Sequence, residues 1–196
     1  LFNALTKTRK ANVANFPFCT IDPNVGVVSV PDARLQKLVE MVSPSKVIPA
    51  AVEFVDIAGL VKGASTGEGL GNKFLANIRE CNAVAQVVRV FVDDNVIHVH
   101  GNVDPKRDIE IVQTELILAD LETVQKRFDK AKAEAKTGNP KLVSYASLIE
   151  KLKLHLAGGG LAFHFIKTPD EALALQDLHL LTGKPILYIA NVHESE

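Results

Sequence analysis

An aspartate and a glycine in D-x-x-G spacing, Asp56 and Gly59, follow a short apolar run. The run, Ala51 to Ile57, has the length and β-branched content of a strand, so the aspartate would stand at the strand's end. Its carboxylate could there hold a Mg²⁺-bound water, while the Gly59 amide could donate to a γ-phosphate without side-chain obstruction. Gly59 is also the first of five glycines within 13 residues, which predicts a loop that moves or approaches a ligand closely. The motif is short enough to occur by chance, but this setting favours a nucleotide site.

Two further polar positions could complete such a site. The hydroxyl of Thr20, in a loop before this strand, could join the Mg²⁺ shell while a γ-phosphate is present and leave it after hydrolysis. From spacing alone, a turn-stabilising threonine is the favoured interpretation. Asn191 and Glu194 follow the apolar run 185–190, and together they could read the edge of a purine. A polar turn after a strand explains this pair equally well.

The elements that would position these residues alternate between strand and helix. We expect strands at 26–30, 51–57, 83–92 and 185–190, and helices at 33–42, 72–82 and 168–183. Strand, helix and strand at this spacing indicate an α/β fold with a mostly parallel sheet flanked by helices. Ligands bind at the carboxyl ends of the strands in such sheets.

The segment between the third expected strand and the last expected helix has a different spacing of apolar residues. Apolar residues recur every three or four positions over 109–135 and again over 142–156, with Gly138-Asn139-Pro140 between them. This pattern predicts an antiparallel helical hairpin inserted into the sheet domain. We therefore expect a nucleotide-binding domain at 1–107 and 159–196 and a helical coiled-coil insertion at 108–158. From Lys126 to Lys153 the net charge is +5, which suits phosphate backbones; a solvated helical face is the alternative.

Composition limits the class of protein. The chain has 196 residues, 47% of them apolar, and a net charge of −1, so it can bury a core and carries no global basic field. Its two cysteines cannot form a disulfide framework and suit a reducing compartment. The longest apolar run, 83–92, is too short to span a bilayer. A cytoplasmic protein without a membrane partner is predicted.

Two long segments resemble the switch regions of the Obg superfamily of P-loop NTPases, in the form found in its YchF branch. Residues 15–24, NFPFCTIDPN, resemble switch I, and residues 56–72, DIAGLVKGASTGEGLGN, resemble switch II. The resemblance extends over the rest of the chain, hairpin included. It implies a G domain, an inserted coiled coil and a C-terminal TGS domain, and a phosphate-binding loop directly before Leu1. We thus expect the loop and the TGS domain to lie outside this fragment, which alone should bind nucleotide poorly.

The resemblance also implies residue roles that depart from ordinary GTPases. Leu60 stands where Ras-like proteins hold a water-orienting Gln, and because an aliphatic side chain cannot orient water, slow hydrolysis or a substitute group is expected. The implied substitute is His98, which matches a loop histidine of the family and could orient a water or accept its proton. An ordinary exposed loop histidine is the alternative interpretation.

The sequence NVHE at 191–194 replaces the GTPase base-reading motif N-K-x-D. The longer Glu194 disturbs the bidentate acceptor for the two N–H donors of guanine. The resemblance implies that the backbone at Val192 faces an adenine, so that ATP is preferred and GTP binds more weakly.

These features predict a Mg²⁺-dependent, slowly hydrolysing ATPase switch that associates with the ribosome, with ribosomal RNA contact through the basic hairpin. The assigned residues are Thr20 and Asp56 for the metal, Gly59, Asn191, Val192 and Glu194 for the nucleotide, and His98 for catalysis. Two alternatives remain: a nucleotide-regulated scaffold with little turnover, and an Obg-like GTPase of ribosome assembly.

Overall fold

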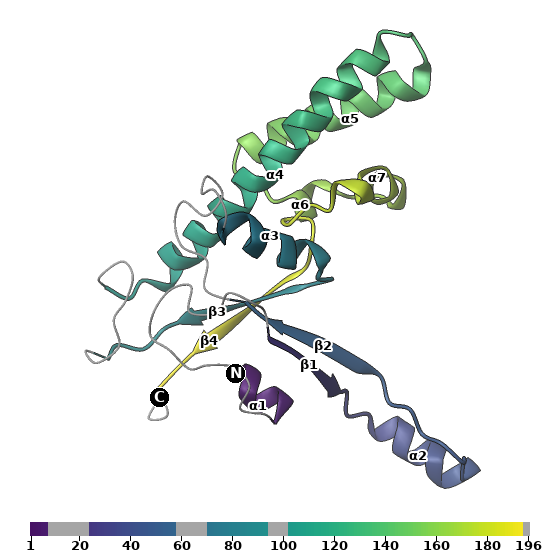
Figure 1. Ribbon diagram of the computed structural model, residues 1–196, viewed down its shortest axis with the longest axis vertical. Coiled ribbons are helices and arrows are strands. Elements are labelled where there is room, and N and C mark those ends of the chain that lie inside the picture. The colour runs from purple at the N-terminus through teal and green to yellow at the C-terminus, as the bar shows by residue number, and fades with distance from the viewer. Residues whose placement is uncertain (8–23, 58–69, 94–101, 194–196) are drawn as a thin grey trace. The chain divides into compact units, whose positions relative to one another are not determined.

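The computed structural model describes residues 1–7, 24–57, 70–93 and 102–193 of the chain (Figure 1). These residues form helices and small sheets, an α/β arrangement. The chain divides into two compact units, Leu1–Gly59 and Leu60–Glu196, and each is described by itself.

The first unit is built on an antiparallel strand pair. Strand β1 (Asn24–Ser29) pairs with β2 (Ala51–Asp56), in a register that runs from Asn24 opposite Asp56 to Ser29 opposite Ala51. Helix α1 (Phe2–Thr6) lies against β1 at Gly26, where an added Cβ would collide with the methyl group of Thr6. A glycine is therefore needed at this close approach.

Helix α2 (Ala33–Val42) has the bounds expected from the sequence. The Asp32 side chain caps it by accepting a hydrogen bond from the amide of Arg34 at 2.9 Å. The helix lies beyond the ends of β1 and β2 (Figure 1). Because α2 does not cross back over the sheet, the two strands it connects run antiparallel, which the strand–helix alternation did not predict.

The second unit contains a parallel strand pair. Strand β3 (Val84–Arg89) pairs with β4 (Ile186–Asn191), from Val84 opposite Ile186 to Arg89 opposite Asn191. Helix α3 (Leu70–Glu80) precedes β3. For these two strands the parallel pairing expected from the sequence is present.

Two long helices follow β3. Helix α4 (Pro105–Ala135) has 31 residues and α5 (Pro140–Ala157) has 18, and they lie side by side (Figure 1). Their break coincides with the expected Gly138-Asn139-Pro140, where Gly138 adopts a positive φ of 74°. Helix α4 is capped by Asp104 and runs without interruption through residue 108, where the sequence suggested a domain boundary.

The main core lies between these helices and the segment that leads to β4. Val124 of α4 and Ile149, Leu152 and Leu156 of α5 are at most 1% exposed. Short helices close this core: α6 (Ala162–Phe165), α7 (Pro169–Leu175) and a 3₁₀ turn, η1 (Gln176–Leu178). In the described part of the chain, none of the helices combines the length and apolarity needed to cross a bilayer.

The end of α7 corrects one expectation. A capping box at Thr168, with Pro169 in the first turn, begins the helix as the sequence indicated. The helix, however, ends at Leu175 rather than near Gly183. The chain passes instead through η1 and leaves the helical path at His179, whose φ is 47°, and beyond this turn the amides of Leu181 and Thr182 donate to the buried carboxylate of Asp120.

Candidate functional site

The carboxyl edge of the β3–β4 pair brings two predicted site residues to the place where ligands bind in open α/β sheets. Asn191 ends β4 directly opposite Arg89, the last residue of β3, and the Asn191 carbonyl accepts from the Val90 amide at 3.0 Å. Asn191 and Val192 are both exposed. The base-reading candidates therefore stand on the rigid end of a paired strand with their side chains accessible.

The chain that leaves β3 at this edge is held by Arg89. The guanidinium donates to the carbonyls of Phe91 and Asp93 at 2.9 and 3.0 Å, and its centre lies 4.6 Å from the Phe91 ring. The same ring lies 6.3 Å from that of His193 at 51°. These contacts order residues 89–93, the segment from which the chain continues toward residue 98.

In the first unit, Asp56 stands at the end of a paired strand, as Asn191 does in the second. Asp56 ends β2, is half-buried, and faces Asn24, the first residue of β1, across the antiparallel pair. Thr20 precedes Asn24 by four residues, so the segment that carries it enters β1 at the end where Asp56 leaves β2. The register therefore shows that the start of β1 and the end of β2 lie at the same end of this strand pair.

Four of the predicted site residues lie outside the described residues: Thr20, Gly59, His98 and Glu194. Asp56 belongs to the first unit and Asn191 and Val192 to the second. Within the described ranges, no cluster of three or more His, Cys, Asp or Glu side chains could hold a metal ion. The donor chemistry still fits Mg²⁺, since Asp56 and Thr20 offer the hard oxygen ligands it prefers and Mg²⁺ usually keeps several waters.

A junction that the sequence did not reveal connects α3, α4 and the loop before β4. From the last turn of α3, Arg79 donates to the carbonyl of His179 and to the Thr123 hydroxyl, both at 3.2 Å. The ammonium of Lys184 donates to the carbonyls of Arg79, at 2.9 Å, and of Cys81. Carbonyls at a helix C-terminus lack intrahelical partners, so Lys184 satisfies groups that would otherwise need water.

Asp120 is the buried centre of this junction. Its side chain is 0% exposed and accepts from the amides of Leu181 and Thr182, both at 2.8 Å, and from the Thr182 hydroxyl at 2.7 Å. That hydroxyl in turn accepts from the Ala162 amide at 3.1 Å. One signal in the sequence could have identified Asp120, because it is a charged residue one turn from Leu116 and one turn from Val124 in a buried row.

Burial dominates the titration of Asp120. Loss of hydration raises the pKa of this carboxyl group above its ordinary value of 3.8, while the donors on Thr182 and Leu181 and the charge of Arg79 lower it by less. The folded chain therefore binds this proton more tightly than the unfolded chain does.

We expect the stability difference between the wild type and Asp120→Asn to depend on pH. Since the folded-state pKa is raised, the contribution of Asp120 to stability declines as pH increases from 3.8 through the raised value. The Asn variant lacks this titration, so the unfolding free energy of the wild type minus that of the variant should decrease over this window. Urea unfolding at several pH values measures the difference, and Asp129→Asn on the exposed side of α4 is the control. A pH-independent difference would contradict the assignment.

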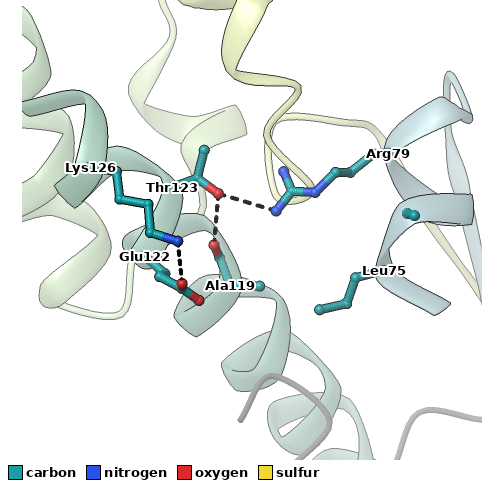
Figure 2. A pocket seen from close by; sticks show the side chains of 7 residues that line it. Leu75, Arg79, Ala119, Glu122, Thr123 and Lys126 are labelled. Carbon is teal, nitrogen blue, oxygen red and sulfur yellow. Dashed lines mark hydrogen bonds and ion pairs between the residues drawn. The ribbon is translucent and has the colours of Figure 1, made fainter. Parts of the chain in front are cut away.

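A polar cleft of about 270 Å³ lies between α3 and α4, lined by Leu75, Ala76, Arg79, Ala119, Glu122, Thr123 and Lys126. Figure 2 shows Arg79 reaching from α3 to Thr123, while Lys126 turns toward Glu122 on its own helix. Both cations of the cleft are already hydrogen-bonded to the protein. The cleft is accordingly part of the junction, and its chemistry does not indicate a separate ligand.

Known proteins are similar to this chain over nearly its whole length. A model of the 50S ribosome-binding GTPase family matches residues 1–133. Over all 196 residues the chain is 54% identical to a protein of Bacillus subtilis (strain 168) named ribosome-binding ATPase YchF, and over 194 residues it is 50% identical to the protein of that name from Escherichia coli O157:H7. The chain spans about half of these relatives, 53% of each.

A solved structure agrees with the sequence matches. The Schizosaccharomyces pombe YchF GTPase structure is similar over 99% of this chain and 53% of its own, with a TM-score of 0.76 and 38% sequence identity. The described chain therefore shares the GTPase-type fold of that protein.

Proposed function

The chain belongs to the 50S ribosome-binding GTPase family, and from that premise we propose that it is the nucleotide-binding part of a ribosome-associated, Mg²⁺-dependent ATPase that acts as a molecular switch. The observation that carries the proposal is the carboxyl edge of β3 and β4, where Asn191 stands exposed opposite Arg89. Two relatives that are 54% and 50% identical to this chain are named ribosome-binding ATPases, which supports ATP hydrolysis as the activity and the ribosome as the partner. Since ribosome-bound proteins are cytoplasmic, a cytoplasmic location forms part of the proposal.

We assign base reading to the end of β4. The Asn191 amide and the Glu194 carboxylate offer the donor and acceptors for the edge of a purine, with the backbone at Val192 toward an adenine. A carboxylate one methylene longer than Asp fits the two parallel N–H donors of guanine less well. ATP is therefore the preferred nucleotide and GTP the weaker one.

The phosphates are assigned to the other predicted residues. Thr20 and Asp56 would hold Mg²⁺, which when bound neutralises charge on the phosphate oxygens. The Gly59 amide donates to the γ-phosphate, and His98 orients the attacking water or accepts its proton. Leu60 contributes no polar group to this water, so turnover is slow.

The domain organisation forms part of the proposal. Residues 1–107 and 159–196 make up the nucleotide-binding domain, and residues 108–158 an inserted helical coiled coil. The course of α4 and α5 supports this, since they begin at Pro105 and end at Ala157. Their outer part carries the basic charge that we assign to ribosomal RNA.

Nucleotide preference tests the proposal. In the full-length protein, we expect Mg²⁺-dependent turnover of ATP to exceed that of GTP at equal concentrations, measured as phosphate release. The double variant Val192→Lys/Glu194→Asp, which rebuilds N-K-x-D, should move the preference toward GTP, because a shorter carboxylate accepts both guanine donors. A wild type that prefers GTP would overturn the base assignment and favour the alternative, an Obg-like assembly GTPase.

A further inference from the structure

Two rows of side chains on α4 differ in how their lysines are paired. The first row, at intervals of four residues, consists of Glu122, Lys126, Lys130 and Glu134. Lys126 lies 2.6 Å from the Glu122 carboxylate, and Lys130 lies 4.0 Å from that of Glu134. Each lysine of this row has a carboxylate one turn away, so the row neutralises its own charge.

The second row has no acid. It consists of Phe128 and Lys132 of α4 and of Lys136, the C-cap residue of this helix, at the same interval, and Lys153 of α5 joins it. The ammonium groups of Lys132 and Lys153 lie 5.8 and 4.9 Å from the centre of the Phe128 ring. Within the described ranges, no carboxylate lies at ion-pair distance from Lys132, Lys136 or Lys153.

The two rows face different surroundings. Lys132 and Lys136 follow Lys126 and Lys130 by six residues each, which corresponds to a separation of about 120° around a helix of 3.6 residues per turn. The paired and the unpaired lysines therefore lie on different faces of α4, about a third of a turn apart. A partner that approaches the first face meets two lysines that are paired with glutamates, whereas a partner that approaches the second meets Lys132 and Lys136, for which the described residues offer no carboxylate at ion-pair distance.

Phe128 orders two of the three unpaired lysines, Lys132 and Lys153. Its ring packs against the core between α4 and α5, so it cannot move with the surface. Contact with an aromatic ring stabilises an ammonium group above it and restricts the flexible lysine stem. Side chains that are ordered before binding lose less conformational entropy when a ligand arrives.

We propose that Lys132 and Lys153, which lie over the Phe128 ring, together with Lys136 one turn beyond Lys132, are the surface through which the hairpin contacts the phosphate backbone of RNA in the ribosome, whereas Lys126 and Lys130 do not take part. The proposal rests on the proposed ribosome association and names its contact face. An unpaired lysine releases its counterion and binds phosphate directly, whereas a lysine paired to glutamate must first leave its carboxylate. RNA phosphates accept such contacts without sequence readout.

Two matched double variants test this face in the full-length protein. Lys132→Ala/Lys136→Ala and Lys126→Ala/Lys130→Ala remove the same charge from the same helix at exposed positions. Affinity for 50S subunits, and separately for purified 23S ribosomal RNA, is measured over a range of salt concentrations. We expect the first variant to lose about tenfold in both affinities and to lower the salt slope by about one to two, and the second to stay near the wild type. Lys153→Ala should reduce both affinities in the same direction.

Every other result would contradict part of the proposal. Equal losses in the two double variants would mean that only total charge matters, and a loss confined to Lys126→Ala/Lys130→Ala would place the contact on the face of the paired lysines. Loss of subunit binding with unchanged RNA binding would mean that the partner is an acidic protein. If the wild type binds neither subunits nor RNA, the proposed function fails as well, which separates that failure from an error in the face.

Discussion

Replacing Asp120 by alanine should lower the free energy of unfolding by about 3 kcal/mol, because three buried donors lose their acceptor. The amides of Leu181 and Thr182 and the Thr182 hydroxyl all donate to this one carboxylate. A buried donor left without a partner costs about 1 to 3 kcal/mol, and relief of the buried charge offsets part of the sum. Urea unfolding followed by circular dichroism measures the effect.

Asp129→Ala is the matched control for this change. Asp129 lies on the same helix, is exposed, and among the described residues its side chain accepts from Gln125 alone, at 2.9 Å. We expect its loss to change the unfolding free energy by no more than about 0.5 kcal/mol. Equal unfolding free energies of the two variants would mean that the buried hydrogen bonds of Asp120 do not stabilise the fold, which would contradict this prediction.

The second large effect concerns catalysis. His98→Ala should reduce ATP turnover at least about a hundredfold, because a positioned acid or base contributes about 10²- to 10⁴-fold to proton transfer. Binding of ATP should remain within about twofold, since an imidazole that acts on the water has no role in holding the ground-state nucleotide. Single-turnover phosphate release and equilibrium ATP binding measure the two quantities separately in the full-length protein.

His100→Ala provides the comparison, because His100 belongs to the same segment and no role is assigned to it. This variant should turn over ATP at the wild-type rate. Retained turnover in His98→Ala would exclude the histidine as the group that replaces the missing glutamine. A wild type that binds ATP but hardly hydrolyses it would instead support the alternative of a nucleotide-regulated scaffold.

Local signals in the sequence predicted the local features of the fold. Asp32 begins α2, Pro169 begins α7, and Gly138 separates α4 from α5, each because a cap or a turn residue acts on its immediate neighbours. Part of the candidate site could be predicted from the same kind of local signal. Asp56 and Asn191 were expected at strand ends, and they end β2 and β4.

The features that could not be predicted from the sequence depend on contacts between residues far apart along the chain. The anchoring of the segment after α7 depends on Asp120, some sixty positions away along the chain, and the capping of α3 depends on Lys184. The division of the hairpin lysines into two rows was also missed, since a count of charges cannot tell a lysine beside a glutamate from one beside a phenylalanine. Pairing of this kind is a property of the folded surface.

The unbroken course of α4 has a mechanical consequence. Asp120 and Thr123 fasten this helix to its neighbours, and beyond them it continues to Ala135. At 1.5 Å per residue, the part of α4 from Asp120 to Ala135 is about 22 Å long, and it is packed on α5. A tilt of the hairpin by about 5° about Asp120 would therefore displace its far end by about 2 Å, so a small angular change at a buried carboxylate would be converted into a displacement close to the length of a hydrogen bond.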